Sequence, residues 1–115
     1  MTPYQQKMID DARQQLTAQR TKLEAMSDEG FVIGWDNGLC YAPHNQFFMV
    51  RVLGLIHAPT FASEAEAQAA LPEGLRNGKG EFASVRTVAD AKRKNLADIA
   101  DSLALLTKTE LENDQ

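Results

Sequence analysis

One stretch, from Phe31 to His57, constrains the fold of this chain more than any other, and it reads FVIGWDNGLCYAPHNQFFMVRVLGLIH. It contains the only tryptophan, the only cysteine and both histidines. It is also the segment dense enough in aromatic and β-branched residues to build a sheet. Because helix-type sequence lies on both sides of it, we expect a central sheet with helices toward both ends of the chain.

Turn residues divide this stretch into three predicted strands. Residues 31–35 alternate apolar side chains onto one face, and the Asp-Asn-Gly of 36–38 is typical of a hairpin turn of type I′. Residues 39–42 form the return strand. Residues 46–53 are apolar on both faces, which is typical of a central strand that is covered on two sides.

Three capping patterns predict where helices begin. They start at Thr2, Ser63 and Thr87, and each is followed three residues later by a residue with a side-chain carbonyl or carboxylate. With Gly30 as the terminator of the first helix, they predict helices over 3–28, over 64–71 and from 88 onward. A fourth strand is expected over 81–87.

The predicted order is therefore α-β-β-β-α-β-α, which indicates an α+β fold with an antiparallel sheet of about four strands and long N- and C-terminal helices. The 115 residues fit a single domain. Its predicted segments are an N-terminal helix over 1–30, a β-meander over 31–57, a short helix and fourth strand over 58–87, and a C-terminal helix over 88–115.

The terminal helices carry narrow apolar stripes. Ile9, Leu16 and Leu23 recur every seven residues in the first helix. Such a stripe can pack against the closing helix of the same chain. It can equally form a two-fold interface, so a homodimer through the terminal helices is a second expectation.

Basic residues concentrate in one segment of an otherwise acidic chain. The net charge is −4, yet residues 76–95 hold six cations and only two carboxylates. Three of the cations fall in the first turns of the closing helix, where the helix dipole disfavours them unless an anion compensates. That anion can come from a protein partner or from nucleic acid, and the candidate contact residues are Arg76, Lys79, Arg86, Lys92, Arg93 and Lys94. The alternative is a solvated face held by i,i+4 pairs between Asp90 and Lys94 and between Lys94 and Asp98.

Candidate catalytic chemistry is confined to Cys40 with His44 or His57. The Cys-x-x-x-His spacing can serve a metal or a nucleophile, but a metal site needs three or four ligands and a nucleophilic cysteine needs a lowered pKa. A buried structural cysteine is the interpretation we favour. The glycines match no phosphate-binding loop. We therefore predict no catalytic residues, no metal, no cofactor and no enzymatic activity.

The location expected from the sequence is the cytoplasm. The first residues, MTPYQQKMIDDARQQ, lack the apolar core of a secretory signal. No run reaches the roughly 20 apolar residues that span a bilayer, so no membrane contact is expected.

Three segments together resemble small accessory proteins of phages and mobile elements. They are the hairpin FVIGWDNGLCY, the capped segment FASEAEAQAALPEG that begins at Phe61, and the strand GEFASVRTV. The resemblance to anti-CRISPR-type inhibitors of host defence implies a non-enzymatic protein-binding module, encoded by a phage, that blocks a host nuclease complex in the host cytoplasm. The alternatives are a nucleic-acid-associated accessory protein that uses the basic segment 76–94 and a small enzyme that uses Cys40 and a histidine.

Overall fold

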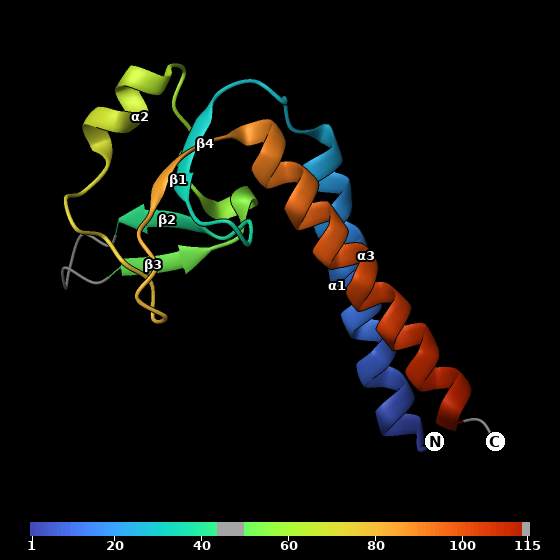
Figure 1. Ribbon diagram of the computed structural model, residues 1–115. Helices are drawn as coiled ribbons and strands as arrows, with labels where there is room; N and C mark the ends of the chain where they lie inside the picture. The colour runs from blue at the N-terminus through green and yellow to red at the C-terminus, as the bar shows by residue number, and fades with distance from the viewer. Residues whose placement is uncertain (44–49, 114–115) are drawn as a thin grey trace. The chain divides into compact units, whose positions relative to one another are not determined.

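The computed structural model describes residues 1–43 and 50–113 (Figure 1). The chain divides into two compact units. The helical unit consists of Met1–Ala25 and Leu96–Gln115, and the sheet unit consists of Met26–Asn95. The sequence placed segment boundaries at 30/31, 57/58 and 87/88, whereas the two units divide at 25/26 and, inside the closing helix, at 95/96. The elements in chain order are α1 (Pro3–Ala25), β1 (Phe31–Gly34), β2 (Cys40–Pro43), β3 (Val50–Leu53), the 3₁₀ helix η1 (Leu55–His57), α2 (Glu64–Ala70), β4 (Ser84–Thr87) and α3 (Val88–Asn113).

The strands form one antiparallel sheet in the order β3-β2-β1-β4, which confirms the predicted α+β class. β4 returns from late in the chain to pair with β1 along its whole length, from Phe31 opposite Thr87 to Gly34 opposite Ser84. This places β1 and β2 inside the sheet. The prediction that the third strand is central is therefore wrong, since β3 lies at the edge of the sheet (Figure 1). The prediction depended in part on residues 46–49, which lie outside the described residues.

The core of the sheet unit is built on β1, whose last three residues are buried. Ile33 and Trp35 pack with Leu75 into one apolar cluster, against which Phe61, Tyr41, Leu71 and Ala83 are partly buried. Val32 is fully buried as well, and successive side chains of a strand point to opposite faces. Both faces of β1 are therefore covered, as a near-continuous apolar run requires.

All three predicted caps are present. The Thr2 and Gln5 pair is reciprocal: the Gln5 N–H donates to Thr2 Oγ1 at 3.1 Å, and the Thr2 N–H donates to Gln5 Oε1 at 3.0 Å. Ser63 Oγ accepts the Glu66 N–H at 3.1 Å, and Thr87 Oγ1 accepts the Asp90 N–H at 3.1 Å. These contacts lie within one helical turn, which is why sequence alone could locate them.

The first helix ends earlier than predicted, at Ala25 instead of near Asp28. Ser27 Oγ accepts the Glu29 N–H at 3.1 Å, a local bond that competes with further helix. Gly30 adopts a φ of 102°, and its carbonyl accepts the Val88 N–H at 2.9 Å. Gly30 therefore directs the chain into β1 and does not cap α1.

Within the helical unit, α1 runs antiparallel to the C-terminal part of α3 (Figure 1). Ile9 and Leu23 of α1 and Ile99 of α3 are buried, so the predicted pairing of the terminal helices within one chain is present. Polar contacts join the same helices, because Glu110 on α3 accepts hydrogen bonds from Gln6 Nε2 at 2.7 Å and from Arg13. Among the helices in the described ranges, none combines the length and the apolar character that a membrane span needs.

Glu110 should make the helical unit acid-sensitive. The hydrogen bond from Gln6 and then the one from Arg13 hold the pKa of Glu110 below its usual value of 4.5. A carboxyl with a lowered folded-state pKa contributes stability that is present above its unfolded pKa and is lost as pH falls through the folded one. We therefore expect the thermal midpoint, followed by circular dichroism, to fall between about pH 5 and pH 3, with Glu110→Gln flattening the fall.

The matched control for this test is Glu112→Gln. Glu112 is an exposed carboxylate on the same helix, and its contact to Lys108 is long at 3.9 Å. Glu112→Gln should keep the acid dependence of the wild type. An unchanged slope in Glu110→Gln would show that this carboxylate contributes nothing to the pairing of the helices.

Candidate functional site

The basic segment resolves into two groups of cations. Arg86, Lys92, Arg93 and Lys94 lie on β4 and the start of α3, and Asp90 is the common partner of Arg86, Arg93 and Lys94. Asp90 contacts Arg93 at 2.7 Å, Lys94 at 3.1 Å and Arg86 at 3.8 Å. The hydrogen bonds from Arg93 and then Lys94 hold the pKa of Asp90 below its usual value of 3.8. The predicted i,i+4 pair of Asp90 with Lys94 is thus confirmed.

Two of these cations, Arg86 and Lys92, pair with carboxylates from distant parts of the sheet unit. Arg86 pairs with Asp36, in the turn between β1 and β2. Lys92 Nζ contacts Asp28 at 2.9 Å and donates to the Met26 carbonyl at 2.7 Å, which leaves its side chain only 13% exposed. The contacts of Lys92 with Asp28 and Met26, together with those of Asp90, compensate the positive charge at the start of α3 from within the chain. Arg86, Lys92 and Lys94 are therefore held by their own chain, and Arg93 alone of the four keeps an exposed side chain.

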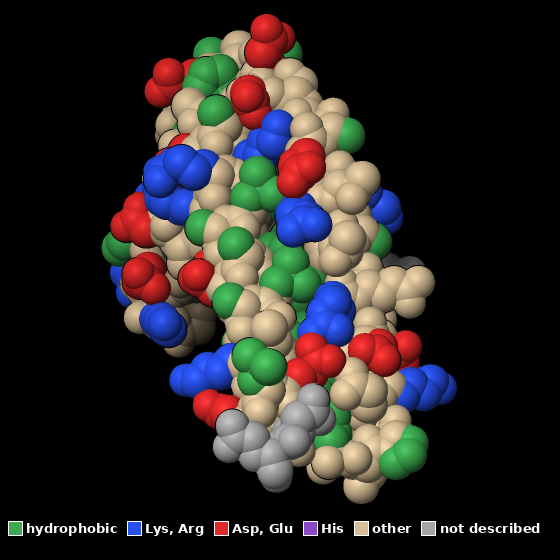
Figure 2. Space-filling view, turned by 90° about the vertical axis from the view of Figure 1, so that its right-hand side faces the viewer, with side chains coloured by type: hydrophobic (Ala, Val, Ile, Leu, Met, Phe, Trp, Pro, Cys, Tyr) green, Lys and Arg blue, Asp and Glu red, His purple; other side chains and the backbone are tan. Residues whose placement is uncertain are grey.

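Figure 2 draws one face of the protein, on which basic and acidic side chains are interspersed and no broad basic field forms. A surface of this kind gives little long-range attraction for phosphate backbones, which need clustered positive charge.

Arg76 and Lys79 belong to the other group, on a hairpin from Leu75 to Ala83. The Ala83 N–H donates to the Leu75 carbonyl at 3.0 Å, and Arg76 pairs with Phe82 across the hairpin. The sequence instead predicted a single strand over 81–87. The signal for the hairpin was the Asn-Gly-Lys-Gly run of 77–80, set between two short segments that pair.

The turn of this hairpin is braced by one side chain. Asn77 Oδ1 accepts the backbone N–H groups of Lys79 and Glu81, both at 3.0 Å, and Asn77 Nδ2 donates to Glu81 Oε1 at 3.2 Å. Gly80 supplies the positive φ of 79° that the turn requires. The tip is therefore held in one conformation by its own residues.

Phe82 and Arg76 form an exposed pair on this braced hairpin. The Arg76 guanidinium carbon lies 4.2 Å from the centroid of the Phe82 ring, and Phe82 is 61% exposed. Leu75 and Ala83 pack on the apolar cluster instead, and alternation along each arm turns Arg76 and Phe82 to the other side. We call Arg76, Lys79 and Phe82 the hairpin surface.

A cavity of about 200 Å³ opens where this hairpin approaches the turn between β1 and β2. Trp35 is a lining residue that is itself buried, and its Nε1 donates to the Glu81 carbonyl at 2.9 Å. Leu39 adds an apolar side chain that is 40% exposed. The lining residues are Trp35, Asn37, Leu39, Asn77, Gly78 and Lys79. The cavity is mostly apolar and has the size of one side chain.

Cys40 lies in a setting that does not suit a nucleophile. Its side chain is 1% exposed, and burial raises the pKa of the thiol to about 11. Its Sγ lies 3.6 Å from the Gly38 carbonyl, to which it can donate. His57 is exposed on η1, whereas His44 lies outside the described residues. Within 1–43 and 50–113, no three His, Cys, Asp or Glu residues are grouped in a way that could hold a metal ion.

Comparison with known proteins gives no relative to argue from. No family model, no curated protein and no solved structure matches this chain. The function therefore has to be argued from the hairpin surface, the cavity beside Trp35 and the charges around them.

Proposed function

We propose that this chain is a non-enzymatic protein-binding module whose contact residues are those of the hairpin surface. The observation that carries the proposal is the exposed Phe82 ring with Arg76 stacked on it. Aromatic residues and arginine are enriched at protein interfaces and dominate their binding energy. A ring that is mostly exposed adds little to the core of its own chain, so its burial by a partner is the larger available gain.

The rigidity of the hairpin supports the same proposal. The bonds made by Asn77 hold the turn before any partner arrives. Contact residues that are already ordered lose less conformational entropy on association. The cavity beside Trp35 offers a socket for one partner side chain, and Lys79 at its rim favours a partner with carboxylate or carbonyl oxygens nearby.

The resemblance to host-defence inhibitors supplies the partner class in this proposal. The module binds a working surface of a host nuclease complex and blocks it by occlusion. Of the six cations that the sequence singled out, Arg76, Lys79 and Arg93 are the ones whose exposure suits contact with such a partner. Arg86, Lys92 and Lys94 serve the fold through their carboxylate partners.

Paired substitutions test the proposal. Arg76→Ser with Phe82→Ser should reduce partner capture from a lysate at least about 30-fold, the loss expected when an interface anchor of about 2 kcal/mol is removed. The thermal midpoint should stay nearly unchanged, because both side chains are exposed. The matched control, Arg20→Ser with Leu111→Ser, removes one exposed arginine and one exposed apolar residue elsewhere. Equal capture by both double variants would rule out the hairpin surface.

Fluorescence of Trp35 gives a second measurement on the same complex. It is the only tryptophan of the chain, so its emission reports directly on the cavity that it lines. A purified partner that lacks tryptophan at its interface should change this emission as its side chain enters. If the partner binds and the Trp35 emission does not change, the contact lies away from this cavity.

Nucleic acid is the alternative partner, and Arg76 and Lys79 beside an exposed ring are the residues that favour it. Binding to a labelled single strand or duplex should then weaken steeply with salt, because phosphate contacts release counterions. No anisotropy change with either probe at low salt would remove this alternative.

A further inference from the structure

We propose that the cavity beside Trp35 binds the C-terminal residue of a partner protein, with an apolar side chain inside the cavity and the free carboxylate at its rim. This inference deepens the proposed function and rests on it for the partner being a protein. It adds which part of the partner enters the cavity. All the residues that line the cavity belong to the sheet unit.

The size and the walls of the cavity limit its occupant. Its volume of about 200 Å³ is below the roughly 300–1,000 Å³ of pockets that hold small-molecule ligands. Trp35 and Leu39 supply apolar wall. The Trp35 side chain is only 3% exposed, so its ring is not open for a nucleic-acid base to stack on. One aliphatic side chain is therefore the occupant that the walls suit.

The polar side chains of the lining have spare donors and engaged oxygens. Asn37 Oδ1 accepts the Leu39 N–H at 3.0 Å. Asn77 Oδ1 accepts the N–H groups of Lys79 and Glu81, both at 3.0 Å. Within the described part of the chain, neither Asn37 Nδ2 nor Lys79 Nζ has an acceptor. Such a lining suits an occupant that brings acceptors only, and an ionised carboxylate is such a group.

The charges around the cavity favour the same occupant. The hairpin holds two cations, Arg76 and Lys79, against the single carboxylate of Glu81. Asp36, which is next to the lining in sequence, is neutralised by its pair with Arg86. The balance at the rim is therefore positive, which attracts a carboxylate and disfavours a cationic occupant.

A chain end brings the apolar side chain and the carboxylate to one small cavity together. In a C-terminal residue both groups are attached to the same Cα. In an extended segment, by contrast, successive side chains point to opposite sides, so an acidic residue next to the apolar one would point away from the cavity. Capture of a C-terminal carboxylate is also an established mode of peptide recognition. A partner that ends in an aliphatic residue such as leucine therefore fits best.

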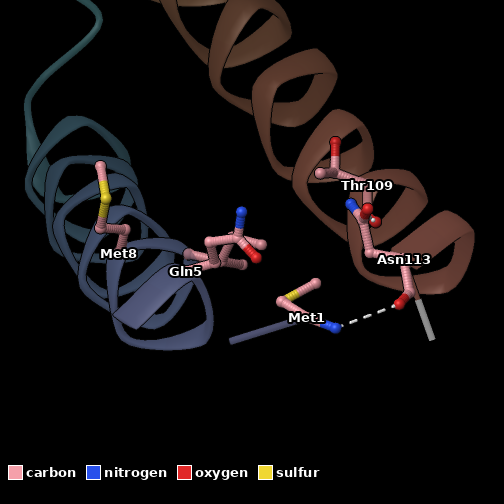
Figure 3. A pocket seen from close by; sticks show the side chains of 6 residues that line it. Met1, Gln5, Met8, Thr109 and Asn113 are labelled. Atoms are coloured by element: carbon pink, nitrogen blue, oxygen red, sulfur yellow. Dashed lines mark hydrogen bonds between the residues drawn. The ribbon is translucent and has the colours of Figure 1, made fainter. Parts of the chain in front are cut away.

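A cavity of about 220 Å³ in the helical unit has to be distinguished in any binding test. Its lining includes Met1, whose amino group donates to the Asn113 carbonyl at 3.4 Å, as Figure 3 shows. No tryptophan lines that cavity, and Trp35 is the only one in the chain. A change in Trp35 emission therefore reports on the cavity of the sheet unit.

Small probes that differ in one group test the inference. N-acetyl-leucine carries the side chain and a free carboxylate, and it should change the Trp35 emission with a dissociation constant on the order of 1 mM. N-acetyl-leucinamide lacks the charge and should bind at least about tenfold more weakly. N-acetylglycine keeps the carboxylate but lacks the side chain, and it should also bind at least about tenfold more weakly.

Lys79→Gln separates the carboxylate contact from the apolar one. It should weaken the binding of N-acetyl-leucine about tenfold and leave that of N-acetyl-leucinamide unchanged, because only the charge pair is removed. The matched control is Lys22→Gln, which removes an exposed cation of α1 that has no ion pair within the described residues. The Lys22→Gln variant should bind both probes as the wild type does.

Three results would overturn the inference. The first is an unchanged Trp35 emission with N-acetyl-leucine, and the second is equal affinity for the acid and the amide. The third is tight binding of an amidated peptide in which leucine is followed by an internal aspartate, since the chain end would then not be the occupant. Loss of capture in Arg76→Ser with Phe82→Ser, without binding of N-acetyl-leucine, would refute this inference and leave the proposed function standing. The reverse pattern would refute the proposed function alone.

Discussion

Gly34→Ala should destabilise the sheet unit by about 3 kcal/mol or more, the largest effect that we expect of a single methyl group in this chain. Gly34 is buried in β1 opposite Cys40. A Cβ at this position would lie 2.4 Å from the Leu39 carbonyl oxygen and 3.2 Å from the Cys40 Cα. Both are backbone atoms, which cannot rotate away as the end of a side chain can. The new methyl group therefore separates β1 from β2 at the point where the hairpin closes.

Urea unfolding followed by Trp35 fluorescence measures this loss in the sheet unit itself. Gly78→Ala is the matched control, because no atom outside the neighbouring residues lies within 4 Å of its Cβ position and its φ is not positive. Gly78→Ala should change the free energy of unfolding by less than about 0.5 kcal/mol. A similar small change in Gly34→Ala would mean that β1 and β2 can separate there at little cost.

Asn95→Ala should cost about 2–4 kcal/mol in the same assay. Asn95 Oδ1 accepts the Leu55 N–H at 3.2 Å, and its Nδ2 donates at 2.7 Å to the Gly38 carbonyl and at 2.7 Å to the Ala91 carbonyl. One amide thus joins α3 to η1 and to the turn between β1 and β2. Alanine leaves the Leu55 N–H and the Gly38 carbonyl without these partners in a largely buried place, and unsatisfied groups of this kind are costly.

Asn113→Ala is the control that distinguishes the tertiary hydrogen bonds of Asn95 from its local bond within α3. Asn113 Nδ2 donates to the Thr109 carbonyl at 2.9 Å, the same bond to the preceding turn that Asn95 makes to Ala91. Asn113 is exposed, however, so its loss should cost less than about 0.5 kcal/mol. If the two variants lost equal stability, the bonds to Leu55 and Gly38 would contribute nothing. Asn95→Asp keeps the acceptor for Leu55 but turns a carboxylate oxygen toward the Gly38 and Ala91 carbonyls, so it should cost at least as much as Asn95→Ala.

The parts of the fold that sequence predicted well are those decided within one turn of chain. The caps at Thr2, Ser63 and Thr87 needed only a residue type and a spacing of three. The pairing of Asp90 with Lys94 followed from a spacing of four. Such contacts are set by helix geometry, whatever the rest of the molecule does.

The predictions that failed concerned strand neighbours. Sequence placed the third strand at the centre of the sheet because of its apolar composition, but β4 pairs with β1 and leaves β3 at an edge. It also took residues 81–87 for one strand, whereas 81–83 belong to the hairpin with Leu75. The apolar composition of a strand indicates how much of its surface is buried. It does not indicate which neighbouring strand or helix covers that surface.

The candidate site shows the same division. Sequence picked out the basic segment by charge alone, and Arg76 and Lys79 remain exposed there. It could not foresee that Asp28 would reach Lys92 or that Asp36 would reach Arg86, because each pair is separated by 50 residues or more. Phe82 was not predicted to be a surface residue, because its exposure depends on the pairing with Arg76 across the hairpin.

The sequence by itself determined the fold class, the residues at which the helices begin and the placement of the strands between the two terminal helices along the chain. These features follow from hydrophobic periodicity and helix capping, which act over a few residues. Only the tertiary structure decided which cations are already paired, where Asn95 bonds and how Phe82 comes to face solvent. The physical reason is that charge pairing and burial depend on distance in space. Sheet register and helix packing set that distance, and both join residues that lie far apart in the chain.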